Sequence, residues 1–263
     1  MMIAPPTLGT RLRRGLASTV VWQGVLGLVC FFIVWQLLRS VGLLVVMPGP
    51  LEVIADIPRQ VAQEGYALSW LASSQRVFLG FGIAAVLALV LGILLGVTRK
   101  LRALTFPIFG ILRPVPPLAW LPLAILFWPT AESTMVFLTF MGAFFPIFIN
   151  VLAGIDNIDA RYVQAAMSLG ASKRTLFTRI LIPGALPSVF IGLTISIAIT
   201  WEVVIAAEMA SANHGLGYLT WNAYMSQSMI GIVVGMLSIG IAGLISSALM
   251  NALGRRTMPW RRS

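Results

Sequence analysis

The chain has 263 residues, of which 59% are hydrophobic and only 10% are charged. Soluble domains carry about 25% charged residues, so this composition excludes an ordinary soluble protein and indicates an integral membrane protein. The net charge of +10 would suit nucleic-acid binding. Most basic residues, however, lie in four clusters beside apolar stretches, at 11–14, 99–102, 161–179 and 255–262. Short cytoplasmic loops hold Lys and Arg in this way, which argues against a nucleic-acid partner.

The N-terminal region predicts a basic cytoplasmic segment over residues 1–18, followed by a first span from Val20 to Leu38. The apolar core of a signal peptide has about 7–15 residues, so this longer stretch favours a retained span. Cys30 is the single cysteine and lies within it, so neither a disulfide nor a cysteine metal cluster is available.

The next region is expected outside the membrane over residues 46–73, with a short interfacial helix over 51–64 that Pro58 breaks. An uncharged stretch from Val77 to Thr98 then predicts the second span, because about 20 apolar residues cross the ~30 Å hydrocarbon layer. Gly92 and Gly96 form a GxxxG pair within it, which we interpret as a site of close helix packing.

The third predicted span, 103–128, is rich in proline and contains a charged residue, Arg113. An unbroken helix excludes so many prolines. Irregular backbone at membrane depth is tolerated only where it is buried in protein or lines a cavity. We therefore expect this stretch to contribute to a translocation pathway, with Arg113, Pro116, Pro117 and Trp120 as its candidate residues.

The remaining sequence predicts three more spans around one polar loop. These elements are the fourth span 133–155 with Pro146 as a kink, the cytoplasmic loop 155–187, the fifth span 186–209, an outer loop or re-entrant piece over 210–228, and the sixth span 229–253 with Gly231 and Gly235 as a second small-residue pair. The predicted fold is all-α with six spans, one transmembrane domain over 19–253, and a cytoplasmic basic tail over 254–263. Both termini are expected in the cytoplasm.

Three charges lie within or at the edge of the predicted spans: Arg113, Glu202 and Glu208. Such charges cost at least ~2.5–3.5 kcal/mol each on insertion scales, so they usually face a cavity or pair with one another. Arg113 is expected either to contact an anion in passage or to hold neighbouring helices together, with Glu202 as a partner if their helices are adjacent. Glu202 suits pairing or gating, and Glu208 is near enough to the outer end to reach water.

Other residue types predict no catalysis. The sequence has no GxxxxGK[ST] phosphate-binding loop, so we do not expect this chain to hydrolyse ATP. His214 is the single histidine, and neither a catalytic residue nor a metal site is predicted. Aromatic residues near the span ends predict an interfacial belt, or alternatively the lining of a vestibule. These residues are Trp120, Trp201, Tyr218, Trp221 and Tyr224. The belt is the favoured interpretation for all of them except Trp120, which lies inside the proline-rich stretch.

The loop 155–187 carries the signals of two short helices. Asp156 or Asp159 is placed to cap the first, and Gly170 to end it. Ser172 is placed to cap a second helix that runs toward Pro183. The first helix has an Ala-rich, flat side, and a small apolar helix in a basic loop suits docking into a groove of another protein.

Residues of this loop resemble the "EAA" coupling loop of permease subunits of ABC importers. The resemblance rests on Gln164-Ala165-Ala166, Gly170, Phe177 and Ile182-Pro183, with Gln164 where the family usually has Glu. It implies that the loop docks on the ATPase subunit. The residues expected to make that contact are Ala160, Tyr162, Val163, Gln164, Ala165, Ala166, Ser168, Leu169, Gly170 and Ala171.

Two further stretches resemble the taurine/alkanesulfonate and nitrate/bicarbonate branch of that family: 113–123 (RPVPPLAWLPL), and Ala206–Met209 leading to Gly215–Tyr218. The resemblance implies a type I importer permease of MetI-like fold in a bacterial inner membrane, carrying a small anion. The proline-rich stretch leans toward sulfonates. The implied partners are two ATPase subunits that bind ATP and Mg, a second permease copy, and a periplasmic or lipoprotein binding protein.

Two other classes of protein are weighed against this one. A stand-alone ion-coupled secondary transporter would usually show inverted repeats and a midplane ion site, and neither is visible in the sequence. An intramembrane enzyme would need catalytic residues that the chain does not offer. Uptake driven by an ion gradient without ATP would distinguish the first alternative.

Overall fold

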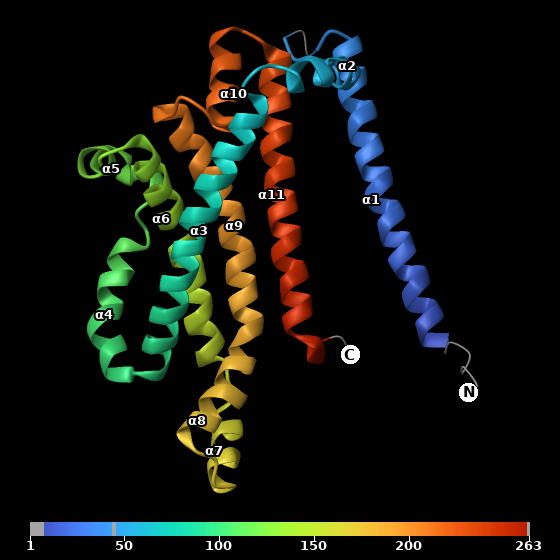
Figure 1. Ribbon diagram of the computed structural model, residues 1–263. Coiled ribbons are helices and arrows are strands. Elements are labelled where there is room, and N and C mark those ends of the chain that lie inside the picture. The colour runs from blue at the N-terminus through green and yellow to red at the C-terminus, as the bar shows by residue number, and fades with distance from the viewer. Residues whose placement is uncertain (1–7, 44–45, 262–263) are drawn as a thin grey trace. The chain divides into compact units, whose positions relative to one another are not determined.

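The computed structural model describes the backbone of residues 8–43 and 46–261, and the side chains of residues 22–43 and 46–260 (Figure 1). Within these ranges the regular elements are helices, which confirms the predicted all-α class. Residues 1–7 of the predicted cytoplasmic N-terminal segment lie outside the described residues. The chain divides into two compact units, Met1–Gln60 and Val61–Ser263.

The first unit contains α1 (Leu8–Ser40) and most of α2 (Pro50–Val61). Residues Trp22–Ser40 of α1 are long and apolar enough to cross a membrane, as predicted. Glu52, in the first turn of α2, accepts a hydrogen bond from the Gly49 N–H at 3.1 Å and pairs with Arg39 at 3.6 Å. The predicted break at Pro58 is wrong, because Pro58 lies inside α2 and the helix continues to Val61. A proline removes one backbone hydrogen bond, and the helix ends within a turn of it.

The second unit is built on three long helices: α3 (Tyr66–Val97), α6 (Ala131–Asp156) and α9 (Ile182–Ser211). They run side by side in Figure 1, with α6 in contact with both of the others. Their buried apolar side chains form one continuous cluster, which includes Phe81 of α3, Phe148 of α6 and Ile197 of α9. Since this cluster joins all three helices, it is the structural core of the unit.

Small residues lie where these helices cross. A Cβ added to Gly92 of α3 would come within 2.7 Å of Val151 Cγ1 on α6, and one added to Gly192 of α9 within 2.7 Å of Asn150 Cβ. Real Cβ atoms essentially never approach that closely, so glycine lets the backbones come together. The predicted packing role of the Gly92–Gly96 pair is thus confirmed.

The beginning of α3 differs from the prediction. The outer segment was expected to reach residue 73 and the span to begin at Val77, but α3 begins at Tyr66. The charge of Arg76 interrupts the apolar stretch in the sequence, which is why the span was expected to begin after it. The structure buries Arg76 to 2% exposure, so the charge lies inside the helix bundle and does not mark its end.

The proline-rich third span is broken, as its composition predicts. It consists of α4 (Arg99–Leu112), the 3₁₀ turn Pro117–Trp120 and α5 (Leu121–Phe127), and the direction of the helix axis changes by 86° at the break. The residues between α4 and the turn are Arg113–Pro116. Proline has no backbone N–H to continue a helix, so the three prolines at 114, 116 and 117 end α4 and redirect the chain.

The C-terminal part contains α10 (Leu216–Met225), α11 (Met229–Thr257) and the 3₁₀ turn Pro259–Arg261. The sixth span is confirmed at Met229–Thr257. The segment 210–228, expected as an outer loop or re-entrant piece, holds the end of α9 and the helix α10. α10 packs against α9 and α11. Its first residues, Leu216 and Gly217, are buried.

Five helices in the described part of the chain are long and apolar enough to cross a membrane. Counting the bent pair of α4 and α5 as one further span gives six, the predicted number. The loop between α6 and α9 holds α7 (Ala160–Ser168) and α8 (Lys173–Leu176). Figure 1 shows these two short helices at the end of the second unit opposite α10.

Candidate functional site: the coupling loop, a buried ion cluster and a broken span

The loop after α6 folds as its capping residues predict. The Asp159 carboxylate caps α7 by accepting a hydrogen bond from the Arg161 N–H at 2.9 Å. It also accepts one from Arg161 Nε at 2.8 Å. Both hydrogen bonds lower the pKa of Asp159, and the one from the Arg161 side chain has the larger effect. Asp156, the alternative cap, instead forms a two-bond ion pair with Arg102 of α4, at 2.7 and 2.8 Å.

Gly170 ends α7 in the left-handed conformation, with φ +78°. The Ala171 N–H then donates to the Ala166 carbonyl at 3.0 Å, which satisfies one of the free carbonyls at the helix end. Ser172 accepts a hydrogen bond from the Thr175 N–H at 3.2 Å and so caps α8, as predicted. The second helix does not stop near Pro183. It continues through a π-helical turn, Phe177–Leu181, into α9, so Lys173–Ser211 is one 39-residue helical stretch.

The predicted ATPase-contact residues form an exposed surface on α7 and the turn that follows it. Leu169 is 88% exposed and Tyr162 is 68% exposed, although both side chains are largely apolar. The remaining predicted residues are exposed or half-buried, and none is buried: Ala160, Val163, Gln164, Ala165, Ala166, Ser168, Gly170 and Ala171. A short helix that leaves such side chains open is suited to docking into a groove of another protein.

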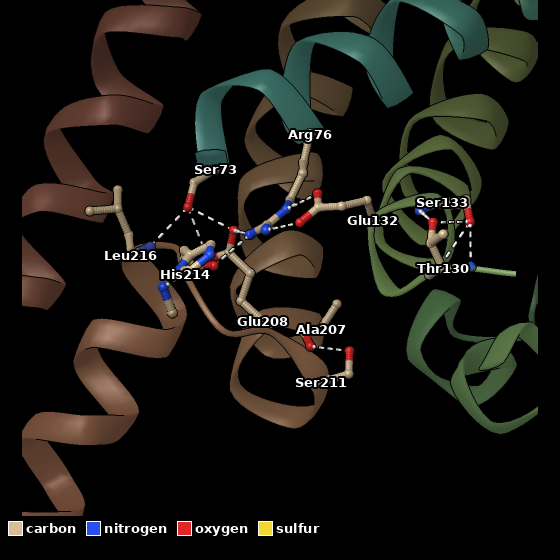
Figure 2. Close-up of polar contacts among 11 residues, drawn as sticks. Ser73, Arg76, Thr130, Glu132, Ser133, Ala207, Glu208, Ser211, His214 and Leu216 are labelled. Carbon is tan, nitrogen blue, oxygen red and sulfur yellow. Dashed lines mark hydrogen bonds and ion pairs between the residues drawn. The ribbon is translucent and has the colours of Figure 1, made fainter. Parts of the chain in front are cut away.

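A cluster of charged and polar residues lies at the start of α10 (Figure 2), and Figure 1 shows α10 at the end of the second unit opposite α7. Arg76 Nε donates to Glu132 Oε2 at 2.7 Å, and Arg76 Nη2 binds the other Glu132 oxygen. On its other side, Arg76 Nη1 donates to Glu208 Oε1 at 2.6 Å and to the His214 carbonyl at 2.7 Å. One guanidinium therefore joins α3, α6, α9 and the loop that precedes α10.

Glu208 is the acidic centre of this buried ion cluster and is 0% exposed. Its Oε2 accepts a hydrogen bond from the Gly217 N–H at 2.9 Å. The Ser73 hydroxyl lies 2.7 and 2.9 Å from the two carboxylate oxygens and accepts a bond from the Leu216 N–H at 2.9 Å. A buried carboxylate is tolerated when paired and hydrogen-bonded in this way. Glu208 therefore does not reach water, contrary to the expectation from its position.

Glycine is required where the chain passes over Glu208. Gly215 has φ +132°, and a Cβ on it would collide with the Glu208 carboxylate. In the first turn of α10, the Gly217 N–H donates to the carboxylate and the Leu216 N–H donates to Ser73, and a helix start favours a negative charge beside it. The two parts of the motif Ala206–Met209 and Gly215–Tyr218 therefore lie together in the structure. The first supplies the Glu208 carboxylate, and the second supplies the start of α10 that binds it.

Three members of the buried ion cluster were not predicted from the sequence: Ser73, Arg76 and Glu132. A signal for Arg76 exists in the sequence, because residues 65–98 contain no other charge. The stretch on each side of it is long enough to continue a helix. Glu132 lies just before the predicted start of the fourth span, where a charged residue is ordinary, so the sequence gives no sign of its pairing. In the structure its side chain is 62% exposed.

Arg113 lies at the break between α4 and the 3₁₀ turn, on an exposed part of the surface. It borders a cavity of about 330 Å³ and a second one of about 360 Å³. Pro117 borders the first of these, and Pro116 is exposed beside it. The structure does not form the considered Arg113–Glu202 pair: the ion pairs of the described residues include neither residue. Glu202 is exposed on α9.

The aromatic residues divide into two groups. Trp201 is 3% exposed and donates to Ser246 Oγ at 3.1 Å, so it belongs to the bundle core and to neither a belt nor a vestibule. Trp221 and Tyr224 are exposed on α10 with ring centroids 5.2 Å apart, and Tyr218 is half-buried. Trp120 packs against a second apolar cluster around Leu138.

Comparisons with known proteins agree with this architecture. Residues 88–262 match the family described as "Binding-protein-dependent transport system inner membrane component". The chain is 33% identical over 269 residues to the nitrate import permease protein NrtB of Leptolyngbya laminosa, covering 96% of this chain and 91% of that protein. It is 34% identical over 234 residues to the bicarbonate transport system permease protein CmpB of Synechococcus elongatus, covering 84% and 83%.

A solved structure shares the fold. An inward-facing structure of the MetNI methionine ABC transporter matches with a TM-score of 0.58 at 18% identity, over 73% of this chain and 94% of that one. This confirms the predicted MetI-like architecture. The chain belongs to the inner-membrane component family of binding-protein-dependent transport systems, and it is a multi-pass ABC transporter permease.

Proposed function

We propose that this chain forms the translocation pathway of an ATP-driven importer for a small inorganic anion, nitrate or bicarbonate. The exposed α7 helix with its Gly170 turn carries this proposal. It presents an apolar surface on a loop that contains four basic residues, at the end of the unit where cytoplasmic loops are expected. An ATPase subunit docked there would bind ATP and Mg and hydrolyse the nucleotide, while this chain performs no catalysis.

The continuity of the helices supports coupling. α6 leads directly into the loop, and Lys173–Ser211 leads out of it as one helical stretch. Arg102 of α4 is tied to Asp156 at the end of α6. A displacement of the loop is therefore transmitted to α4, α6 and α9 together. Helices α6 and α9 border one of the two cavities beside Arg113, and α4 and α6 border the other.

The names of the relatives support the cargo. The similar proteins named above import nitrate and bicarbonate, which favours these anions over the sulfonates toward which the proline-rich stretch leans. The family description supports a separate binding protein that delivers the anion. The remaining assembly is part of the same proposal: two ATPase subunits, a second copy of this permease and a bacterial inner membrane, with both termini in the cytoplasm.

The partners are tested by purifying the tagged chain from native membranes in mild detergent and identifying the co-purifying proteins by mass spectrometry. The proposal expects an ATPase subunit with a phosphate-binding loop at near-equal amounts, with a binding protein retained after mild cross-linking. Recovery of the chain alone, in a form that transports on an ion gradient without ATP, would instead establish the secondary-transporter alternative.

The coupling loop is tested at Gly170. Nothing in this chain lies within 4 Å of a Cβ added there, so within the chain a substitution acts through the backbone, whose φ is +78°. A residue other than Gly or Asn in this conformation costs roughly 1–2 kcal/mol. We expect Gly170→Val to misdirect the end of α7 and to reduce ATP-coupled anion uptake, with the chain still inserted in the membrane.

The matched control is Gly170→Asn, because asparagine adopts the left-handed conformation readily. We expect this variant to keep most of the uptake and to co-purify with the ATPase as the unchanged chain does. Full ATP-coupled uptake by Gly170→Val would show that the coupling loop has been assigned wrongly.

A further inference from the structure

Two basic residues of the second unit lie outside the clusters at 99–102, 161–179 and 255–262: Arg76 and Arg113. Their surroundings differ sharply. Arg76 is enclosed between two glutamates. Arg113 belongs to none of the ion pairs found among the described residues, and its side chain is exposed. One of the two charges is thus neutralised within the protein, whereas the other remains free for an external anion.

Arg113 stands between two cavities of about 330 Å³ and 360 Å³. Ile149 of α6 also lines both of these cavities. Among the described residues that line these cavities, Arg113 is the only charged one. An anion entering either space therefore meets one positive charge and no negative one.

The broken span creates this position. Arg113 follows the last residue of α4, and the 86° bend begins beside it. The three prolines after it cannot continue α4, so the cavity of about 330 Å³ opens between this bend, α6 and α9. A charged residue inside a membrane protein is tolerated when it faces such a water-accessible cavity.

We propose that Arg113 is a binding contact for the transported oxyanion, which it holds by paired hydrogen bonds at the break of the third span. A guanidinium is planar and presents two parallel N–H groups that match two oxygens of nitrate or bicarbonate. One water molecule occupies roughly 30 Å³ of liquid, so either cavity admits an anion together with part of its hydration shell. The assignment rests on the proposed importer function for the identity of the anion.

The site is tested by the reactivity of introduced cysteines, because Cys30 is the single native cysteine and is removed by Cys30→Ser. Val115→Cys places a thiol at the first cavity and Gly110→Cys at the second, where nothing lies within 4 Å of an added Cβ. Each variant is treated with two thiosulfonate reagents of similar size, one carrying a sulfonate and one a trimethylammonium group. The measured quantity is the ratio of the two reaction rates.

With Arg113 present, we expect the anionic reagent to react faster and nitrate to slow it. Arg113→Gln should lower the ratio of anionic to cationic rates about tenfold, since one charge within a few ångströms acts oppositely on the two reagents. The control is Arg99→Gln, which removes the same charge from the start of α4, about 20 Å away at 1.5 Å per residue. It should leave the ratio unchanged.

An unchanged ratio in Arg113→Gln overturns the proposal. An equal fall in Arg99→Gln also overturns it, because the preference would then reflect net charge alone. A thiol that reacts with neither reagent has the same consequence, since ions would not reach the cavities. This assay needs neither ATP nor a partner, so its result is independent of the importer assignment.

Uptake of nitrate by proteoliposomes that contain the chain, its ATPase and its binding protein then tests the role in transport. We expect Arg113→Gln to reduce uptake at low nitrate at least about tenfold, with ATP hydrolysis retained. The uptake of Arg113→Lys should lie between that of Arg113→Gln and that of the unchanged chain, because lysine keeps the charge without the paired donors. ATP hydrolysis without nitrate or bicarbonate uptake in the unchanged complex refutes the cargo. If uptake does not depend on ATP but the ratio of cysteine reaction rates still depends on Arg113, the importer function is refuted and the anion site is retained.

Discussion

Arg76 and Glu208 are among the largest fully buried side chains of the described residues. Burying either ion alone would cost several kcal/mol, and the hydrogen bonds between them, Ser73 and the start of α10 offset that cost. Glu132 binds the same guanidinium from the surface, where its own side chain remains 62% exposed. Removing Arg76 therefore affects a buried carboxylate much more than an exposed one.

We predict that Arg76→Gln and Glu208→Gln each lower the thermal stability of the detergent-solubilised chain, by about 3–5 kcal/mol for the Arg76 substitution, because it leaves a buried charge unpaired. The double variant should lose less than the sum of the two single losses. Thermal unfolding of all four proteins measures this coupling. Glu132→Gln is the control. It should have a smaller effect, because the Glu132 carboxylate of the unchanged chain is largely exposed to water.

Strictly additive losses in the four proteins would contradict the pairing of Arg76 with Glu208. The sequence identified Glu208 through its motif, yet it placed the residue near water and left Arg76 unnoticed. A single sequence shows which charges lie in apolar stretches. It does not show which of them meet, because Ser73 and Arg76 lie more than 130 residues from Glu208 and only the packing of α3 against α9 brings them together.

At the scale of elements, the contact between α3 and α6 depends on glycines at the crossing. Gly92 is buried, and an added Cβ would meet Val151 Cβ at 2.8 Å. The helices must separate to admit a larger side chain, and overpacking typically costs about 1–3 kcal/mol. The sequence predicted this packing correctly, because small residues four apart in a span favour close approach.

We predict that Gly92→Leu lowers the unfolding temperature of the chain and decreases the amount of folded protein in membranes. Gly82→Leu, on the same helix, serves as the matched control, because nothing lies within 4 Å of a Cβ added there. Fluorescence-detected size exclusion of the two variants, heated in parallel, makes the comparison. Equal stability of Gly92→Leu and the unchanged chain would mean that α3 and α6 are farther apart than described.

The broken third span was also predictable in kind, though its geometry was not. The prolines at 114, 116 and 117 indicate that α4 cannot continue past them. They leave open the direction that the chain takes afterwards. That direction follows from α5 packing on α6, where Ala124 contacts the apolar cluster around Leu138.

At the scale of the whole molecule, the basic residues predict its orientation in the membrane. The clusters at 99–102, 161–179 and 255–262 follow or precede spans at one end of the bundle, and the buried ion cluster with α10 lies at the other. Because Lys and Arg are retained on the cytoplasmic side, α7 and the C-terminus should face the cytoplasm.

We predict that alkaline phosphatase fused after residue 226, in the loop between α10 and α11, is active, since it folds only outside the cytoplasm. The same enzyme fused after residue 170 should be inactive, and a fluorescent protein fused to the C-terminus should fluoresce. Enzyme activity and fluorescence in intact cells provide the measurement. Phosphatase activity at residue 170 would invert the proposed topology and move the coupling loop to the wrong side.

The sequence by itself determined the membrane class, the number of spans, the capped coupling loop and the break at the prolines. Each follows from local composition, hydropathy period or backbone preference, which act between residues close in the chain. Tertiary structure alone decided that Arg76 is enclosed with Glu208 and Glu132, that Glu202 remains apart from Arg113, and that Arg113 borders two cavities. These outcomes depend on which helix faces lie together, and that arrangement is the result of packing many small apolar contacts across the whole bundle.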